Sequence, residues 1–137
     1  MKKVLLVLMA AFFSMAMVSC SKSNEDLIIG TWQETEVTYT EYNDGQQIRT
    51  ESMLEEGDIV KMTFKDDHTY SLTYVSEYDE SDDNGTWSIN GDKLTIVDDD
   101  YAMVYTIDKL NKKECNITYS EEMDTAKMTI VIKMKRL

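Results

Sequence analysis

From Leu27 to the end of the chain, apolar and polar residues alternate with a period of two, and the 3.6-residue period of an amphipathic helix is not seen. Each run therefore has one face that favours burial and one that tolerates water. An earlier strand is expected near 30–42. The alternating runs then follow at 60–65, 70–75, 86–89, 93–97, 101–107, 115–119 and 127–134.

Turn residues separate these runs at short intervals, at 66–68, 82–85, 90–92 and 111–113. Asn90-Gly91 suits a two-residue type I′ turn, in which both central residues take a positive φ. Short connections make neighbouring strands pair antiparallel. The sequence therefore predicts an all-β domain, an up-and-down antiparallel barrel of about eight strands.

One connection is longer than the others and spans 43–57. It is the expected rim or lid of the barrel. Residues 50–56 are compatible with one or two helical turns, and Asp44-Gly45 is equally compatible with the start of another hairpin.

The N-terminus is predicted to be a signal peptide over 1–19. Lys2 and Lys3 precede an apolar run, 4–18, that only Ser14 interrupts. This run is shorter than the ~20 apolar residues of a transmembrane helix, and its length and basic start are typical of a secretion signal. A retained anchor helix is the alternative.

At the end of this run, Met17-Val18-Ser19-Cys20 resembles the lipobox of bacterial lipoproteins. The resemblance implies lipidation of Cys20, a polar tether over 20–26 and a lipid anchor in the outer membrane of the cell envelope. Glu25 and Asp26 resemble the acidic surface-export signals of Bacteroidetes lipoproteins, but they lie rather far from Cys20, so a plain solvated tether is the preferred interpretation. The alternative to lipidation is secretion with Cys20 as a free thiol.

Three further motifs lie in 27–137, the expected barrel domain: Gly30-Thr31-Trp32, Phe64–Tyr70 and Gly85-Thr86-Trp87. In this order they resemble the small lipocalin-like lipoproteins of the Bacteroidetes. The resemblance implies that Trp32 closes the bottom of an eight-stranded barrel. It also implies a basic residue packed on that ring, either Lys135 or Arg136.

Tyrosines and methionines recur on the predicted inner faces of the strands. Such a lining suits a small apolar or amphipathic ligand. The expected function is ligand binding by an envelope lipoprotein, and the alternative is a protein-interaction or inhibitor module with a filled core. The predicted ligand-binding residues are Met62, Tyr70, Tyr74, Tyr101, Met103, Tyr105, Tyr119 and Met128.

The charge balance and the scarcity of His and Cys limit other chemistry. With 14 Lys+Arg against 26 Asp+Glu, the formal net charge is −12, which disfavours nucleic-acid binding. The acidic clusters 79–84 and 98–100 do not fit the EF-hand template and are expected to be charged hairpin tips. His68 is expected in a solvated turn and Cys115 in the core. No catalytic residues, metal site or cofactor are predicted, and the chain is not expected to be an enzyme.

Overall fold

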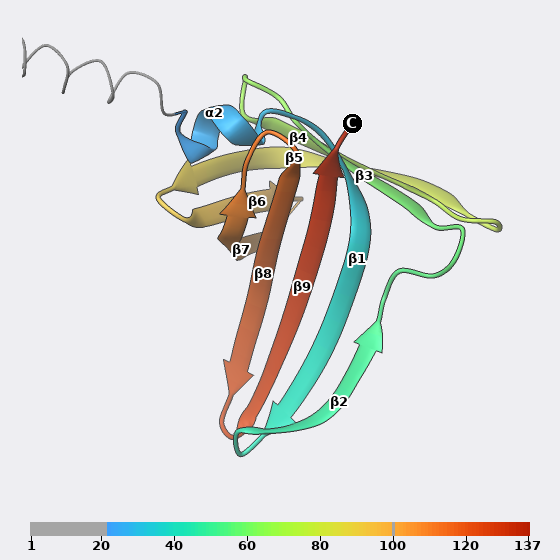
Figure 1. Ribbon diagram of the computed structural model, residues 1–137, viewed down its shortest axis with the longest axis vertical. Coiled ribbons are helices and arrows are strands. Elements are labelled where there is room, and N and C mark those ends of the chain that lie inside the picture. Colours follow the sequence, from blue (N-terminus) through green and yellow to red (C-terminus); the bar gives the residue numbers. More distant parts are fainter. Residues whose placement is uncertain (1–21, 100) are drawn as a thin grey trace, which may run out of the picture.

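The computed structural model describes residues 22–99 and 101–137, which form one short helix and nine strands (Figure 1). Residues 1–21, which include the predicted signal peptide and Cys20, lie outside the described residues. The elements are α2 (Asn24–Ile28), β1 (Gly30–Asn43), β2 (Gln46–Ser52), β3 (Ile59–Phe64), β4 (Thr69–Val75), β5 (Glu80–Asn90), β6 (Lys93–Asp98), β7 (Tyr101–Leu110), β8 (Glu114–Met123) and β9 (Ala126–Arg136).

The strands form one antiparallel sheet that closes on itself. From β3 to β9 each strand pairs with the next in sequence, and β1 pairs with both β3 and β9. β1 and β3–β9 therefore make a closed eight-stranded barrel, which confirms the predicted fold class. β2 is an additional strand that pairs with β1 alone.

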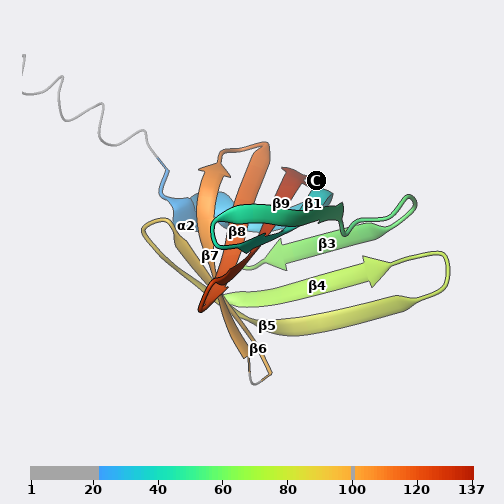
Figure 2. The same ribbon diagram turned by 90° about the horizontal axis from the view of Figure 1, so that it is seen from below.

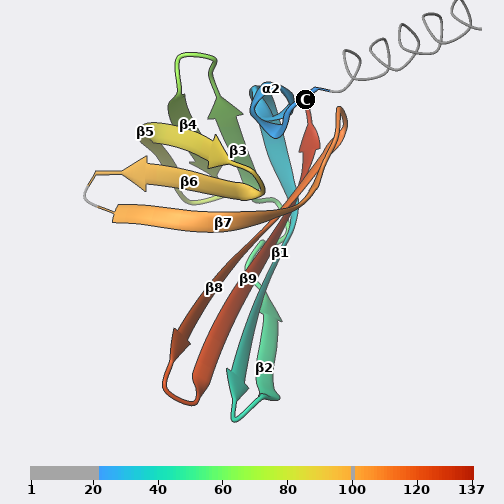
Figure 3. The ribbon, with the colours of Figure 1, turned by 90° about the vertical axis from the view of Figure 1, so that its left-hand side faces the viewer.

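Along one of its edges, β1 pairs first with β3 and then with β2. The barrel is open at the end where β1 no longer pairs with β3. Residues 30–33 of β1 pair with β3, and residues 38–43 pair with β2. On the other side, β8 pairs with β7 only over 115–118 and continues beside β9 alone. The strands β2-β1-β9-β8 consequently extend beyond the closed half as a four-stranded sheet, here called the protruding sheet (Figures 1 and 3).

The closed half has a dense aromatic core in which the three sequence motifs meet. Trp32 and Trp87, the tryptophans of the two Gly-x-Trp motifs, are 0% and 2% exposed. The Trp32 indole Nε1 donates to the carbonyl of Ile28 at 2.8 Å, and Trp87 Nε1 donates to the carbonyl of Lys65 at 2.9 Å. Phe64 packs edge-on against Trp87 with ring centroids 5.9 Å apart. Burial of these rings supplies much of the hydrophobic stabilisation.

Arg136 is the basic residue that packs on the first-strand tryptophan. Its Cζ lies 4.3 Å from the Trp32 ring centroid. The guanidinium also donates to the carbonyls of Ile29 and Lys112, each at 2.8 Å, and to that of Leu27. Lys135, one residue earlier, is exposed because neighbouring residues of a strand face opposite sides.

The short helix α2 covers the closed end of the barrel. Ser23 caps it, with its Oγ accepting from the amide of Asp26, and Ile28 is fully buried. α2 begins within the predicted tether, 20–26. No helix among the described residues is long and apolar enough to cross a membrane.

The long connection after β1 is mostly a hairpin. Asp44 and Gly45 both have positive φ, 49° and 76°, and form its turn. Of the two expectations for this region, the hairpin is confirmed and the helix over 50–56 is wrong. Only 53–58 remains irregular.

The turn predicted at 82–85 is also wrong. β5 begins at Glu80, and Val75 pairs with Glu80 across a turn at 76–79. Ser76 holds that turn, because its Oγ accepts from the amide of Asp79 at 3.1 Å. Residues 80–84 are exposed, so they show no apolar alternation, and the ladder with β4 makes them a strand. Most of the first acidic cluster is therefore not a hairpin tip.

Candidate ligand-binding site

The closed half of the barrel is filled by its own side chains. Seven side chains there are fully buried, and they come from α2 and five different strands. They are Ile28, Trp32, Phe64, Leu94, Cys115, Ile117 and Met134. Any ligand of appreciable size therefore has to bind toward the open end.

The structure distributes the eight predicted lining residues between these two regions. Met62, Tyr70 and Tyr105 are buried in the core of the closed half. Tyr101 is 78% exposed at the start of β7. The other four, Tyr74, Met103, Tyr119 and Met128, are half-buried.

On the protruding sheet, the inner face continues the core as ordered rows of side chains. Across β1, β9 and β8, Val37, Ile132 and Ile117 lie side by side and are buried. The next row is Tyr39–Ile130–Tyr119, and the one after it is Glu41–Met128–Glu121. The rows thus change from buried aliphatic to aromatic and then to acidic toward the tip of the sheet.

The outer face of the same sheet has a different chemistry. Its row between the tyrosines and the glutamates is Thr50–Thr40–Thr129–Ser120. The hydroxyls of Thr40 and Thr50 are 3.2 Å apart, and those of Ser120 and Thr129 are 3.3 Å apart. A hydroxyl row is satisfied by itself and by water. The inner face is therefore the apolar one.

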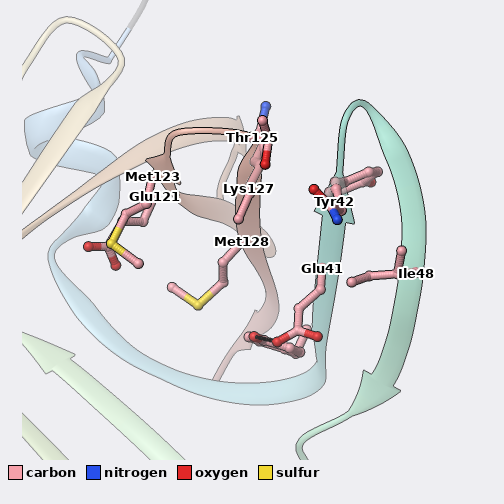
Figure 4. Close-up of a pocket in the computed structure, with 11 residues that line it drawn as sticks. Glu41, Tyr42, Ile48, Glu121, Met123, Thr125, Lys127 and Met128 are labelled. Carbon is pink, nitrogen blue, oxygen red and sulfur yellow. Dashed lines mark hydrogen bonds between the residues drawn. The ribbon is translucent and has the colours of Figure 1, made fainter.

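A pocket of about 490 Å³ lies at the tip of the protruding sheet (Figure 4). In this view Met128 occupies the middle, with Met123 on one side and Ile48 of β2 on the other. Met123 and Ile48 are 69% and 63% exposed, which is high for large apolar residues. Of the eight predicted residues, Met128 is the one that lines this pocket. The full lining is Tyr39, Glu41, Tyr42, Asn43, Ile48, Glu121, Met123, Thr125, Ala126, Lys127 and Met128.

Tyrosine–carboxylate pairs provide the ordered polar groups near the pocket. Tyr39 donates to Glu41 at 2.5 Å, and this hydrogen bond is the main reason why the pKa of Tyr39 is raised. Tyr119 donates to Glu121 at 3.5 Å. On β2, Arg49 forms an ion pair with its neighbour Glu51 at 2.7 Å.

A further carboxyl group, that of Glu34, lies on the inner face between the closed half and the pocket. Glu34 pairs with the buried Met134, next to an irregularity in the β1–β9 register. Burial raises its pKa from the ordinary value of 4.5 to about 7. Burial, and then the charge of Glu34, raise the pKa of Tyr105 to about 12. The same two causes, with Tyr105, raise the pKa of Tyr70 above its usual range.

Four residues of the pocket were not predicted from the sequence: Tyr39, Glu41, Ile48 and Met123. One signal for two of them is present in the sequence, because Tyr-x-Glu occurs at 39–41 and 119–121, although it also occurs at 78–80, where Tyr78 is exposed. Ile48 gives no such signal, since its strand shows no clear alternation.

Other reactive groups are held in structural roles. Cys115 is fully buried, and burial raises the pKa of its thiol to about 12, which makes it inert. His68 is not simply solvated: its ring stacks on Trp87 at 4.6 Å between centroids, and its Nε2 lies 3.1 Å from Glu25 of α2. Within 22–99 and 101–137, no three His, Cys, Asp or Glu side chains are placed to hold a metal ion.

Solved structures with the same fold include two from Bacteroides. A lipocalin-like protein from Bacteroides uniformis has 14% identity and a TM-score of 0.53, with 80% of this chain and 98% of that chain covered. A protein from Bacteroides eggerthii has 12% identity and a TM-score of 0.52, with 80% and 99% covered. Lobster apocrustacyanin A1 has 14% identity and a TM-score of 0.53, with 83% of this chain but 63% of that chain covered.

At these identities the likeness extends to the fold. No curated protein matches the chain. The family model of the lipocalin-like domain matches residues 28–131, which include all of β1–β8 and the first half of β9. This chain therefore belongs to the lipocalin-like domain family.

Proposed function

We propose that this protein is a lipid-anchored lipoprotein of the bacterial cell envelope that binds a small apolar or amphipathic ligand at the open end of its barrel. The observation that carries the proposal is the pocket of about 490 Å³ on the apolar inner face of the protruding sheet. Ligand pockets in proteins commonly have volumes of about 300–1,000 Å³.

The side chains of the pocket and the fold support this function. Met123 and Met128 are flexible and polarisable, so they adapt to ligands of different shape. Tyr39 adds an aromatic surface with a hydroxyl group. Members with the lipocalin-like fold commonly bind small hydrophobic ligands, and the fold is typically a binding fold.

The position of the pocket is compatible with an anchor at Cys20. α2 and the closed end lie at one end of the molecule, and the tip of the protruding sheet lies at the other (Figures 1 and 3). A lipid attached four residues before Asn24 would hold the closed end toward the membrane, since four extended residues span at most about 14 Å. The pocket would then be directed away from the bilayer.

A second candidate is a protein-interaction or inhibitor module without a small ligand. The filled core of the closed half favours it, because this region offers no deep calyx. In that case the exposed Ile48 and Met123 would contact a protein.

Titration with the neutral apolar fluorophore N-phenyl-1-naphthylamine tests the ligand-binding proposal. The domain 22–137 contains all described strands, and a cooperative thermal transition must first establish that it folds alone. We expect saturable binding of one fluorophore. Met128→Asp places a charge in the middle of the pocket and should weaken binding at least tenfold.

Ser120→Asp is the matched control, because it adds the same charge to the outer face of the neighbouring strand. It should change the affinity less than twofold. Equal loss in both variants, or no saturable binding by the folded domain, would favour the protein-interaction module.

A further inference from the structure

Two identical tyrosine–glutamate pairs flank the floor of the pocket. Tyr39 and Tyr119 both pair with Ile130, from opposite sides of β9. Glu41 and Glu121 both pair with Met128 in the same way. Neighbouring strands are about 4.8 Å apart, so the two glutamate backbones are separated by about 10 Å with the thioether of Met128 between them.

The tyrosine hydroxyls orient both carboxylates. Tyr39 donates to Glu41, and Tyr119 donates to Glu121, each across two residues of one strand. A carboxylate that accepts one such bond keeps lone pairs for further donors. Both groups can therefore accept hydrogen bonds from a ligand without giving up their tyrosines.

The positive side chains near the pocket are already engaged. Arg49, which lies beside Glu41 on β2, donates to both carboxylate oxygens of Glu51 at 2.8 and 2.7 Å. Lys127, which contributes to the pocket lining from β9, forms an ion pair with Glu122 of β8 at 3.5 Å. Arg49 and Glu51 lie on the same face as Glu41 and compensate each other, so Glu41 and Glu121 leave an excess of two negative charges on the inner face.

We infer that the pocket binds amphiphilic cations, that is, an alkyl or aromatic body carrying an ammonium group, with the body over Met128 and Ile130 and the charge between Glu41 and Glu121. This inference rests on the proposed ligand-binding function and specifies its ligand class. The paired carboxylates attract a cation, and the faces of Tyr39 and Tyr119 stabilise an organic ammonium group further through cation–π contact. An anionic amphiphile of the same length would meet both carboxylates and be repelled.

Competition against N-phenyl-1-naphthylamine with three eight-carbon compounds tests the ligand class. Octyltrimethylammonium, octanol and octanoate share a chain and differ in charge. We expect octyltrimethylammonium to displace the fluorophore at a concentration at least tenfold lower than octanoate, with octanol between them. The measurement is made on the domain 22–137 and on the full lipidated chain in lipid nanodiscs, with empty nanodiscs as the reference.

The variants Glu41→Gln, Glu121→Gln and their combination remove the charge and keep the shape. The double variant should weaken the affinity for octyltrimethylammonium at least tenfold and change the affinity for octanol less than twofold. Glu77→Gln is the control, because it removes one charge from an exposed turn between β4 and β5 that does not line the pocket. It should change the cation affinity less than twofold.

The outcomes separate this inference from the proposed function. If the fluorophore binds but octanoate competes as well as the cation, the ligand class is wrong and the binding function stands. The same conclusion follows if Glu77→Gln weakens binding of the cation as much as Glu121→Gln, because the effect would then be one of net charge. If the folded protein binds no fluorophore, the proposed function itself fails.

Discussion

At the scale of single residues, the glycine of the first Gly-x-Trp motif is required because a larger residue would not fit there. A Cβ atom at Gly30 would lie 2.2 Å from Nη1 of Arg136, and the backbone there has a φ of +140°. Gly30 therefore leaves room for the guanidinium that stacks on Trp32 and joins α2 to the last strand. The glycine of the second motif is similarly constrained, because a Cβ at Gly85 would lie 2.0 Å from the carbonyl oxygen of Val97.

Gly30→Ala should destabilise the domain by about 3 kcal/mol or more. The positive φ costs an alanine about 1–2 kcal/mol, and displacement of Arg136 loses charged hydrogen bonds of about 1.5–3 kcal/mol each. Urea unfolding followed by tryptophan fluorescence measures the loss. Gly91→Ala, at φ +63° in open space, is the control for the backbone cost alone.

A double-mutant cycle isolates the steric part of this effect. In an Arg136→Ala background, Gly30→Ala should cost only the backbone term, so the two losses are less than additive. Full additivity would show that Gly30 is required for a reason other than the arginine.

A second residue-scale prediction concerns Glu34. Its pKa in the folded protein is raised to about 7, above the ordinary 4.5, so between these values the folded state binds more protons than the unfolded state. Stability therefore falls as pH rises from about 4.5 to 7, and the loss is complete above pH 7. The shift corresponds to about 3 kcal/mol, which water contact at this half-buried group reduces to about 1–2 kcal/mol.

Glu34→Gln should raise the free energy of unfolding at pH 8 by about 1–2 kcal/mol and remove this part of the pH dependence. Urea melts at pH 4.5, 6 and 8 for both proteins test it. Parallel pH profiles of the two proteins would contradict the assignment. Glu36→Gln, on the exposed outer face, is the matched control.

At the scale of secondary-structure elements, β9 is one of the two inner strands of the protruding sheet and has two distinct faces. Ile132 is 7% exposed and belongs to the core, whereas Ile130 is half-buried at the transition to the pocket. Thr129 lies on the outer hydroxyl row. The strand thus passes from core to ligand site along a single face.

Alanine substitutions along β9 should show this gradient. Ile132→Ala should cost about 2–4 kcal/mol, Ile130→Ala about 1–2 kcal/mol and Thr129→Ala about 0.5 kcal/mol. Equilibrium urea unfolding gives the three values. A cost for Thr129→Ala as large as that for Ile132→Ala would mean that the outer face is buried too.

β2 is the least anchored element. All seven of its residues are exposed, and it pairs only with β1. The Arg49–Glu51 ion pair places charges along this edge strand, which disfavours pairing with other chains. A hydrogen bond from the amide of Met53 to the carbonyl of Val37 directs the chain from β2 back toward β3.

At the scale of the whole molecule, the closed half provides most of the stability and the open half carries the proposed binding site. Seen from below in Figure 2, β3, β4 and β5 lie side by side. The closed half contains nearly all of the buried core, and the protruding sheet carries the pocket. Substitutions at the tip should therefore alter binding with little effect on folding.

Anchoring is a prediction at the same scale. Cys20→Ala should release the protein from the membrane fraction, because the acyl chains would supply the anchoring energy. Fractionation followed by a carbonate wash measures it, with Cys115→Ala as the control for loss of a thiol. A Cys20→Ala protein that still sediments with membranes after the wash would exclude the lipid anchor.

Most of the strands, and the direction of their side chains, could be predicted from the sequence alone. Alternation at Val60, Met62 and Phe64, or along β9, indicates the buried face directly, because a strand presents successive residues to opposite sides. Strands that are exposed on both faces cannot be recognised from such alternation. Residues 80–84 and β2 have no apolar face, so only their hydrogen bonds to β4 and β1 make them strands.

The tertiary structure alone decided where a ligand can bind. The choice of Arg136 over Lys135 depends on the register that pairs Arg136 with Trp32, more than 100 residues away. The pocket forms because β1 changes its pairing partner from β3 to β2 along its length. It also requires the register that places Glu41 and Glu121 on either side of Met128. Side-chain direction is a local property of the chain, whereas the register between distant strands is set by the packing of the whole barrel.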